Sequence, residues 1–313
     1  MRLVSFVFKG KSELRLGALA GDRVIDLAQA SQGTLPCQMP AFLEGGQELW
    51  DKGARIAQNP PTNAAVSLSD VLLKAPLPNP SSLRDFIAYE EHAKAGAERR
   101  GEKLNPAWYE LPAYYKGNHR EILGPEEEIP WPYYTQKLDF ECEIACVIGK
   151  KGKNIPPEKA GEYIFGYMIF NDVSARDIQA REMSLRLGPN KGKDFANVFG
   201  PYLVTADEVD PRKDFAMKVR VNGEVWSEGH FKDHYWGFAM MVSHVSQGET
   251  LYPGDVLGCG TYYKGCGLDL NRWLKPGDVI ELEVNKLGIL RNKVGQPEAY
   301  REINYKNQMA GAR

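Results

Sequence analysis

Residues 138–149 constrain the fold of this 313-residue chain more than any other stretch. The even-numbered residues are all apolar, whereas the odd-numbered ones begin with Asp139, Glu141 and Glu143 and continue as small or apolar residues. Because successive side chains of a strand point to opposite faces, this pattern predicts a strand with one core-facing side. The other side holds Glu141 and Glu143 about 7 Å apart, where one of two partly buried carboxylates should protonate unless a cation lies between them. We therefore predict half of a site for a hard metal ion.

The alternative interpretation is a solvated edge strand with ordinary surface acids. Cys142 and Cys146 argue against it, because a face this apolar belongs to a central strand. The five cysteines are an odd number without zinc-type pairs, so we expect reduced, packing thiols. The sequence therefore favours a buried carboxylate pair over an exposed one.

The composition is that of an ordinary globular protein, with 43% hydrophobic and 26% charged residues. A formal net charge of −2 predicts no nucleic-acid partner. No apolar run approaches the roughly 20 residues of a membrane span, and the N-terminus lacks the apolar core of a signal peptide. We expect a cytoplasmic protein without a membrane partner.

The order of elements predicts a mainly β (α+β) fold. Short alternating segments, a helical segment and a proline-rich linker at 73–82 predict a small β-rich domain over residues 1–75 and a larger one over 76–313. Asn222-Gly223 predicts a hairpin, as does the pattern around 278–294. The expected elements are strands at 2–9, 13–20, 23–27, 138–149, 163–170, 215–221, 224–229, 256–259, 278–285 and 289–294, and helices at 38–58, from 82, from 174 and at 233–247.

Three polar clusters flank these elements. Ser82 resembles a helix N-cap, which would place Asp85, Tyr89 and His92 on one helix face, but spacing alone favours a merely solvated face because the segment is very polar. Asp172 follows a predicted strand, and a helix capped by Ser174 would bring Arg176 and Gln179 onto one face. The loop 187–194 contains Lys191 and Lys193, and spacing does not decide whether either points inward.

These motifs resemble the fumarylacetoacetate hydrolase family. The similarity covers most of residues 80–295 and is densest between 138 and 197. The matching stretches are 138–143, 171–179, 193–195, 253–255 leading into Gly260-Thr261, 275–278 and 287–292. The resemblance implies a catalytic β-sheet roll, preceded by a small SH3-like β-domain, and a homodimer.

The resemblance also implies roles for individual residues. Asp85, Glu141, Glu143 and Asp172 match the family's metal carboxylates. His92 matches the catalytic histidine and Asp269 the carboxylate that orients it. Arg176, Gln179 and Lys193 match the polar cluster that stabilises negative charge, and Tyr115, Gly260 and Thr261 match substrate-contacting positions.

The sequence departs from the family pattern in the substrate shell. Ile87 stands where a substrate-contacting tyrosine is expected, and Asn197 replaces a threonine. Lys116-Gly117-Asn118 lacks an expected arginine, and Asp269 is one methylene shorter than the usual glutamate. We therefore expect the chemistry to be retained more closely than the substrate.

Four carboxylates and no sulfur or nitrogen ligand suit Mg²⁺, with Mn²⁺ or Ca²⁺ as alternatives. With such a metal as Lewis acid, His92 would activate water and the polar cluster would hold an enolate. We therefore predict a hydrolase of carbon–carbon bonds in small acidic diketones or acylpyruvates, active in catabolism of aromatic compounds. The alternatives are a decarboxylase, dehydratase or tautomerase of a 2-oxo acid, and a non-catalytic binding protein in which the metal has a purely structural role.

Overall fold

The computed structural model describes residues 1–211, 213 and 215–300. Within these residues, ten strands form the continuous path of the main sheet, in the order β4-β3-β2-β1-β15-β13-β11-β19-β6-β7, with β5 on β1 and β8 on β15. Their bounds are β1 (Arg2–Phe8), β2 (Arg15–Ala20), β3 (Arg23–Asp26), β4 (Ala65–Ser67), β5 (Val71–Lys74), β6 (Ser82–Phe86), β7 (Tyr114–Gly117), β8 (Ile122–Leu123), β11 (Cys142–Ile148), β13 (Ile164–Asp172), β15 (Asn197–Thr205) and β19 (Asp255–Gly258). The predicted mainly β fold is confirmed.

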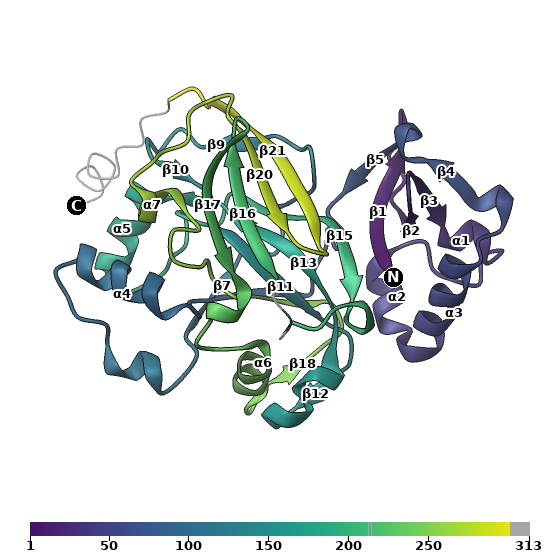
Figure 1. The fold of residues 1–313 in the computed structure, drawn as a ribbon, viewed down its shortest axis with the longest axis horizontal. Coiled ribbons are helices and arrows are strands. Elements are labelled where there is room, and N and C mark those ends of the chain that lie inside the picture. Colours follow the sequence, from purple (N-terminus) through teal and green to yellow (C-terminus); the bar gives the residue numbers. More distant parts are fainter. Residues whose placement is uncertain (212, 214, 301–313) are drawn as a thin grey trace, which may run out of the picture.

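A second sheet packs against the first, and the helices lie around the periphery of the two sheets (Figure 1). The second sheet runs β17-β16-β20-β21-β9, and two further pairs are β10-β14 and β12-β18. The strand bounds are β9 (Ile129–Trp131), β10 (Leu138–Asp139), β12 (Gly152–Lys153), β14 (Ser174–Ala175), β16 (Ala216–Val221), β17 (Glu224–His230), β18 (Thr250–Leu251), β20 (Val279–Val284) and β21 (Gly288–Pro297). The helices are α1 (Leu27–Ala30), α2 (Met39–Glu44), α3 (Gly46–Gln58), α4 (Glu90–Arg99), α5 (Arg176–Ser184), α6 (Phe238–Ser246) and α7 (Gly267–Leu270).

β11 is the central strand that the alternating pattern predicts, and all of its residues are buried. Its even-numbered side chains join a core shared with the second sheet, including Val219 and Leu282. Beyond Glu143, its odd-numbered side chains pack into another core with Phe42 and Trp50 of the N-terminal segment. Apolar burial on both faces holds this strand, and with it Glu143, in a fixed position.

The predicted strand over 138–149 is interrupted at Phe140 and Glu141. Residues 138–139 pair with β14, whereas β11 pairs with β13 and β19. Glu141 forms an isolated bridge with Cys266, and its N–H donates to the side-chain oxygen of Asn171 at 3.0 Å. These contacts replace the regular strand pairing at Glu141.

The helix predicted from Ser82 is wrong. Residues 82–86 form β6, which pairs parallel with β19 and antiparallel with β7. The Ser82 hydroxyl donates to Asp255 at 2.6 Å instead of capping a helix. Pairing on both sides outweighs the local capping pattern, because each sheet partner satisfies backbone groups along the whole segment. Asp85 and His92 therefore come from different elements, β6 and α4.

Other boundaries also shift. Ser174 lies in β14 and its hydroxyl donates to the Asp172 carbonyl at 3.0 Å, so α5 begins at Arg176 without the predicted cap. The segment 38–58 divides into α2 and α3 at Gly46, whose φ of +67° favours glycine. The helix predicted from 233 begins at Phe238. The hairpin at Asn222-Gly223 is confirmed, with φ of +53° and +80° as its tight turn requires.

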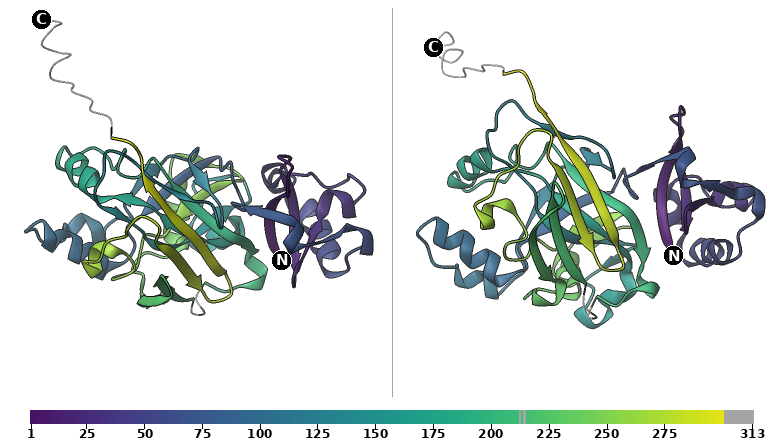
Figure 2. Two further views of the ribbon diagram at one scale, coloured as in Figure 1. Left: turned by 90° about the horizontal axis from the view of Figure 1, so that it is seen from above. Right: turned by 45° about the horizontal axis from the view of Figure 1, so that its top comes forward.

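The N-terminal segment with α1, α2 and α3 lies at one end of the molecule, and α4, α5 and α7 gather at the opposite end (Figures 1 and 2). Within the part of the chain that the structure describes, no helix is both long and apolar enough to cross a membrane. The division predicted near residue 75 stays a prediction, because β1 pairs with β15 and continues one sheet across it.

Candidate active site

Three buried carboxylates converge from neighbouring strands of the main sheet. Asp85 comes from β6, Glu143 from β11 and Asp172 from the end of β13, and their oxygens lie within 4.8 Å of one another. Gly258 of β19 lies between them in the sheet, where an added Cβ would collide with Asp85 Oδ1. The strand order therefore assembles three of the four predicted metal carboxylates in one place.

The electrostatics of this triad fit a bound cation. Glu143 Oε1 and Asp172 Oδ1 are buried and have no hydrogen-bond partner among the described residues. Burial, followed by the charges of the neighbouring carboxylates, raises the pKa of Asp85 and of Glu143 well above the usual range. A divalent ion would satisfy the orphaned oxygens and balance the charge, and oxygen donors alone suit Mg²⁺, Mn²⁺ or Ca²⁺.

Glu141, the fourth predicted metal carboxylate, lies outside this triad. Its carboxylate accepts a hydrogen bond from Arg176 Nη2 at 2.8 Å and contacts Lys193 Nζ, which also contacts Asp172 Oδ2. Burial opposes ionisation of Glu141, but the charges of Arg176 and Lys193 outweigh it and lower its pKa. Glu141 thus holds two cations beside the triad.

Arg176 and Gln179 occupy the same face of α5, as their spacing predicted. Arg176 Nη1 donates to Gln179 Oε1 at 3.0 Å. Lys193 points inward and is 3% exposed, whereas Lys191 is exposed. The structure therefore decides which loop lysine reaches the site, a choice that sequence spacing left open.

His92 and Asp269 are in direct contact. His92 Nδ1 lies 2.8 Å from Asp269 Oδ2, and Arg99 Nη2 donates to Asp269 Oδ1 at 2.7 Å. The Lys264 N–H donates to Asp269 Oδ2 at 3.0 Å. Burial opposes ionisation of Asp269, but the hydrogen bond and charge of His92 outweigh it and lower its pKa. An anionic partner at Nδ1 leaves Nε2 as the nitrogen that can exchange a proton with a ligand.

The predicted substrate-contacting residues border the triad. The Tyr115 hydroxyl donates to Asp172 Oδ2 at 2.9 Å, and the Gly260 N–H donates to Glu143 Oε2 at 3.0 Å and to Asp85 Oδ1 at 3.2 Å. Thr261 is buried and its hydroxyl donates to the Cys142 carbonyl at 3.1 Å. Gly260 and Thr261 thus bind protein groups around the site.

Asp139 is a site residue that the sequence interpretation did not assign. It is fully buried and accepts hydrogen bonds from Arg176 Nε and the Gly267 N–H, both at 2.7 Å, and from the Leu268 N–H at 3.0 Å. It therefore joins Arg176 to the segment that carries Asp269. The sequence feature that could have identified Asp139 is its position on the same predicted strand face as Glu141.

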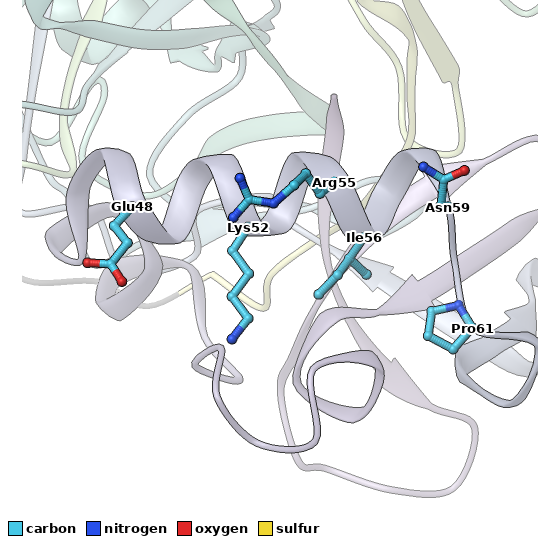
Figure 3. Close-up of a pocket in the computed structure, with 6 residues that line it drawn as sticks. All are labelled: Glu48, Lys52, Arg55, Ile56, Asn59 and Pro61. Carbon is cyan, nitrogen blue, oxygen red and sulfur yellow. The ribbon is translucent and has the colours of Figure 1, made fainter.

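A separate surface pocket lies far from these residues in the sequence, along α3 and the turn after it (Figure 3). Its lining consists of Glu48, Lys52, Arg55, Ile56, Asn59 and Pro61. These side chains are mostly exposed and include none of the predicted site residues. The hollow therefore does not mark the chemical site, which is assembled from buried groups.

Comparisons with known proteins match this architecture. Residues 82–295 match the family model described as fumarylacetoacetate (FAA) hydrolase C-terminal. Mitochondrial oxaloacetate tautomerase fahd2 of Xenopus laevis is 32% identical over 94% of this chain and 90% of its own length. Oxaloacetate tautomerase YisK of Bacillus subtilis is 34% identical over 73% of this chain and 75% of its own length.

A solved structure shows the same fold. The 5-carboxymethyl-2-hydroxymuconate delta-isomerase of Mycobacterium smegmatis superposes with a TM-score of 0.72 at 26% identity, over 95% of this chain and all of its own. These named relatives are tautomerases and an isomerase. The assignment of the chain to the hydrolases of carbon–carbon bonds is therefore wrong.

Proposed function

The chain belongs to the fumarylacetoacetate hydrolase family, and we propose that it is a metal-dependent tautomerase of a small 2-oxo acid such as oxaloacetate. The observation that carries the proposal is the contact between His92 and Asp269, which accompanies the carboxylate triad. Cys266, close to both residues of the pair, is bridged to Glu141, and Glu141 binds the buried cations Arg176 and Lys193. Keto–enol interconversion moves one proton between carbon and oxygen and breaks no carbon–carbon bond. It therefore needs an acid–base group and a means of holding an enolate.

Asp85, Glu143 and Asp172 are the residues that would hold the metal. When bound, a divalent ion supplies Lewis-acid polarisation of the 2-oxo group and orients the substrate. Lys193 and Arg176 supply fixed positive charge beside it. Preorganised cations stabilise negative charge that develops on an enolate oxygen, more so in a site shielded from water.

His92 is the proposed catalytic base and acid. In the keto-to-enol direction, Nε2 accepts the proton from the carbon next to the keto group, while the electron pair moves onto the carbonyl oxygen. Asp269 stabilises the imidazolium that forms. A proton is then delivered from the imidazolium to the enolate oxygen, which gives the enol. In the reverse direction His92 delivers the proton to carbon.

This proton transfer distinguishes the proposal from its rivals. Decarboxylation of a 2-oxo acid requires the metal and the cations but no base that removes a proton from carbon, so the His92–Asp269 pair would serve only to protonate the enolate that forms. A non-catalytic binding protein with a structural metal would need neither the His92–Asp269 pair nor Lys193, whose charge is costly to bury. The relatives named as oxaloacetate tautomerases support the same choice.

Four further properties are proposed. Mg²⁺ as the metal is proposed because the candidate ligands offer oxygen donors alone, and assembly as a homodimer is proposed from the family resemblance. A cytoplasmic location and a division near residue 75 into a small N-terminal and a larger catalytic domain are proposed from the sequence patterns described above.

The proposal is tested by following the enol absorbance of freshly dissolved oxaloacetate with purified protein and Mg²⁺, while a coupled lactate dehydrogenase assay reports pyruvate. Accelerated approach to the keto–enol equilibrium without pyruvate formation is expected. Pyruvate appearing in step with the absorbance change would identify a decarboxylase instead. No acceleration for oxaloacetate or other small 2-oxo diacids would overturn the proposal.

A further inference from the structure

We propose that His92, Cys266 and Asp269 form a second metal site, selective for thiophilic ions such as Zn²⁺, through which these ions inhibit the enzyme. One ligand atom from each residue lies within 4.8 Å of the other two. The binding site follows from this geometry alone. Its inhibitory effect rests on the proposed role of His92 in proton transfer.

The three residues are held together by the fold. His92 lies on α4, while Cys266 immediately precedes α7 and Asp269 lies within it. The Asp269 carboxylate is oriented by Arg99 and by the Lys264 N–H, so it is fixed independently of His92. Cys266 is fully buried, and its backbone is bridged to Glu141. Two of the three donors are therefore positioned before any ion arrives.

The donor set selects a different class of ion from the carboxylate triad. Imidazole nitrogen, thiolate sulfur and carboxylate oxygen are the ligands that Zn²⁺ takes in four-coordinate sites, where three protein ligands leave one position for water. Mg²⁺ prefers oxygen alone and keeps several of its waters. Hard and soft ions thus have separate sites, and Mg²⁺ at the triad does not protect His92 from Zn²⁺.

Binding of an ion at this site is coupled to loss of the proton from the Cys266 thiol. Burial, followed by the charge of Asp139, raises the pKa of the Cys266 thiol well above its usual range, so the free thiol stays protonated. Binding of a thiophilic ion replaces the S–H proton, which is released to solvent, and forms the metal–sulfur bond. The resulting thiolate and the Asp269 carboxylate balance the two positive charges. Coordination of His92 then removes the imidazole from proton transfer.

The other cysteines provide controls. Cys37 is exposed and lies in the N-terminal segment, whereas Cys142, Cys146 and Cys259 are buried in the core. An effect of added metal ions that depends on Cys266 but not on Cys37 therefore places the ion at the site formed by His92, Cys266 and Asp269.

The test uses Co²⁺ as a spectroscopic substitute for Zn²⁺, added to the full-length protein in excess Mg²⁺. Cobalt bound to a thiolate gives a near-ultraviolet charge-transfer band, whereas cobalt on carboxylates does not. We expect the band in the wild type and in Cys37→Ala, with Zn²⁺ bleaching it. Cys266→Ala and Cys266→Val should lack it, and each should lower Zn²⁺ affinity by more than the ~10–100-fold typical of an outer-shell change.

Activity gives a second readout, as the ratio of rates with and without Zn²⁺ within each variant. We expect inhibition in the wild type and Cys37→Ala that excess Mg²⁺ does not relieve, and little inhibition in the Cys266 variants. A band that persists in both Cys266 variants, or inhibition relieved by Mg²⁺, would overturn the inference. A cobalt band in a protein without tautomerase activity would refute the proposed function alone, and activity without a band would refute the second site alone.

Discussion

His92 Nδ1 lies 2.8 Å from Asp269 Oδ2, although 177 positions separate the two residues in the chain. The contact joins α4 to α7, and Arg99 on α4 reaches the same carboxylate. Two side chains of one helix thus converge on a single acid. This arrangement fixes the orientation of the imidazole next to the buried cations, which is what an acid–base group requires.

The first prediction concerns this pair. Asp269→Asn and His92→Ala should each lower kcat for keto–enol interconversion by about 10²–10⁴-fold, the usual worth of general acid–base catalysis. The double variant should be little worse than His92→Ala, because the two groups act as a unit. Mg²⁺ affinity, measured by calorimetry, should change little. Losses that multiply in the double variant would show that the residues act independently.

The second prediction concerns the metal. If Mg²⁺ binds the folded triad and not the unfolded chain, as proposed, it should raise the Tm of the wild type in a concentration-dependent way, and removing divalent ions should abolish turnover. Glu143→Gln deletes an anionic ligand and should lose both effects, whereas the exposed control Glu48→Gln should retain them. Equal stabilisation of both variants by Mg²⁺ would place the ion elsewhere.

The third prediction concerns Lys193. Lys193→Met leaves Glu141 and Asp172 without their shared cation, and removing one partner of a buried ion pair typically costs about 3–5 kcal/mol. Lys191→Met, two residues away on the surface, should lower the free energy of unfolding by much less. The unfolding midpoints of the two variants are compared by urea denaturation in the presence of a chelator. Similar midpoints for the two variants would contradict the placement of Lys193.

The fourth prediction concerns Asp139, which links Arg176 to the segment before Asp269. Asp139→Asn keeps the shape but removes the charge that faces Arg176, so both stability and kcat should fall. Asp22→Asn, at an exposed turn, is the matched control. An Asp139→Asn variant with wild-type kcat and wild-type urea midpoint would show that this connection is dispensable.

Local patterns predicted the parts of the fold that local interactions determine. The alternation along 138–149 identified the central strand, and Asn222-Gly223 identified its hairpin, because both signals lie within a few residues. The segment after Ser82 was predicted as a helix, because its pairing partner β19 lies about 170 residues later and is invisible to a local pattern.

The site was predictable as a set of residues but not as a geometry. Parity placed Glu141 and Glu143 on one face, but it did not show that Glu141 pairs with Arg176 and Lys193 while Glu143 joins Asp85 and Asp172. The identity of the site residues also does not distinguish hydrolysis from tautomerisation. The proposed metal, cations and acid–base pair would serve both reactions, which differ in whether the base acts on water or on carbon.

The most direct test of the account is proton exchange at the carbon next to the keto group. In D₂O, wild-type protein with Mg²⁺ should exchange the methylene protons of oxaloacetate for deuterium faster than the enzyme-free rate, as followed by proton NMR, without forming pyruvate. His92→Ala should return the exchange to near the enzyme-free rate. Wild-type exchange no faster than the blank, or equal exchange by His92→Ala, would contradict the central claim.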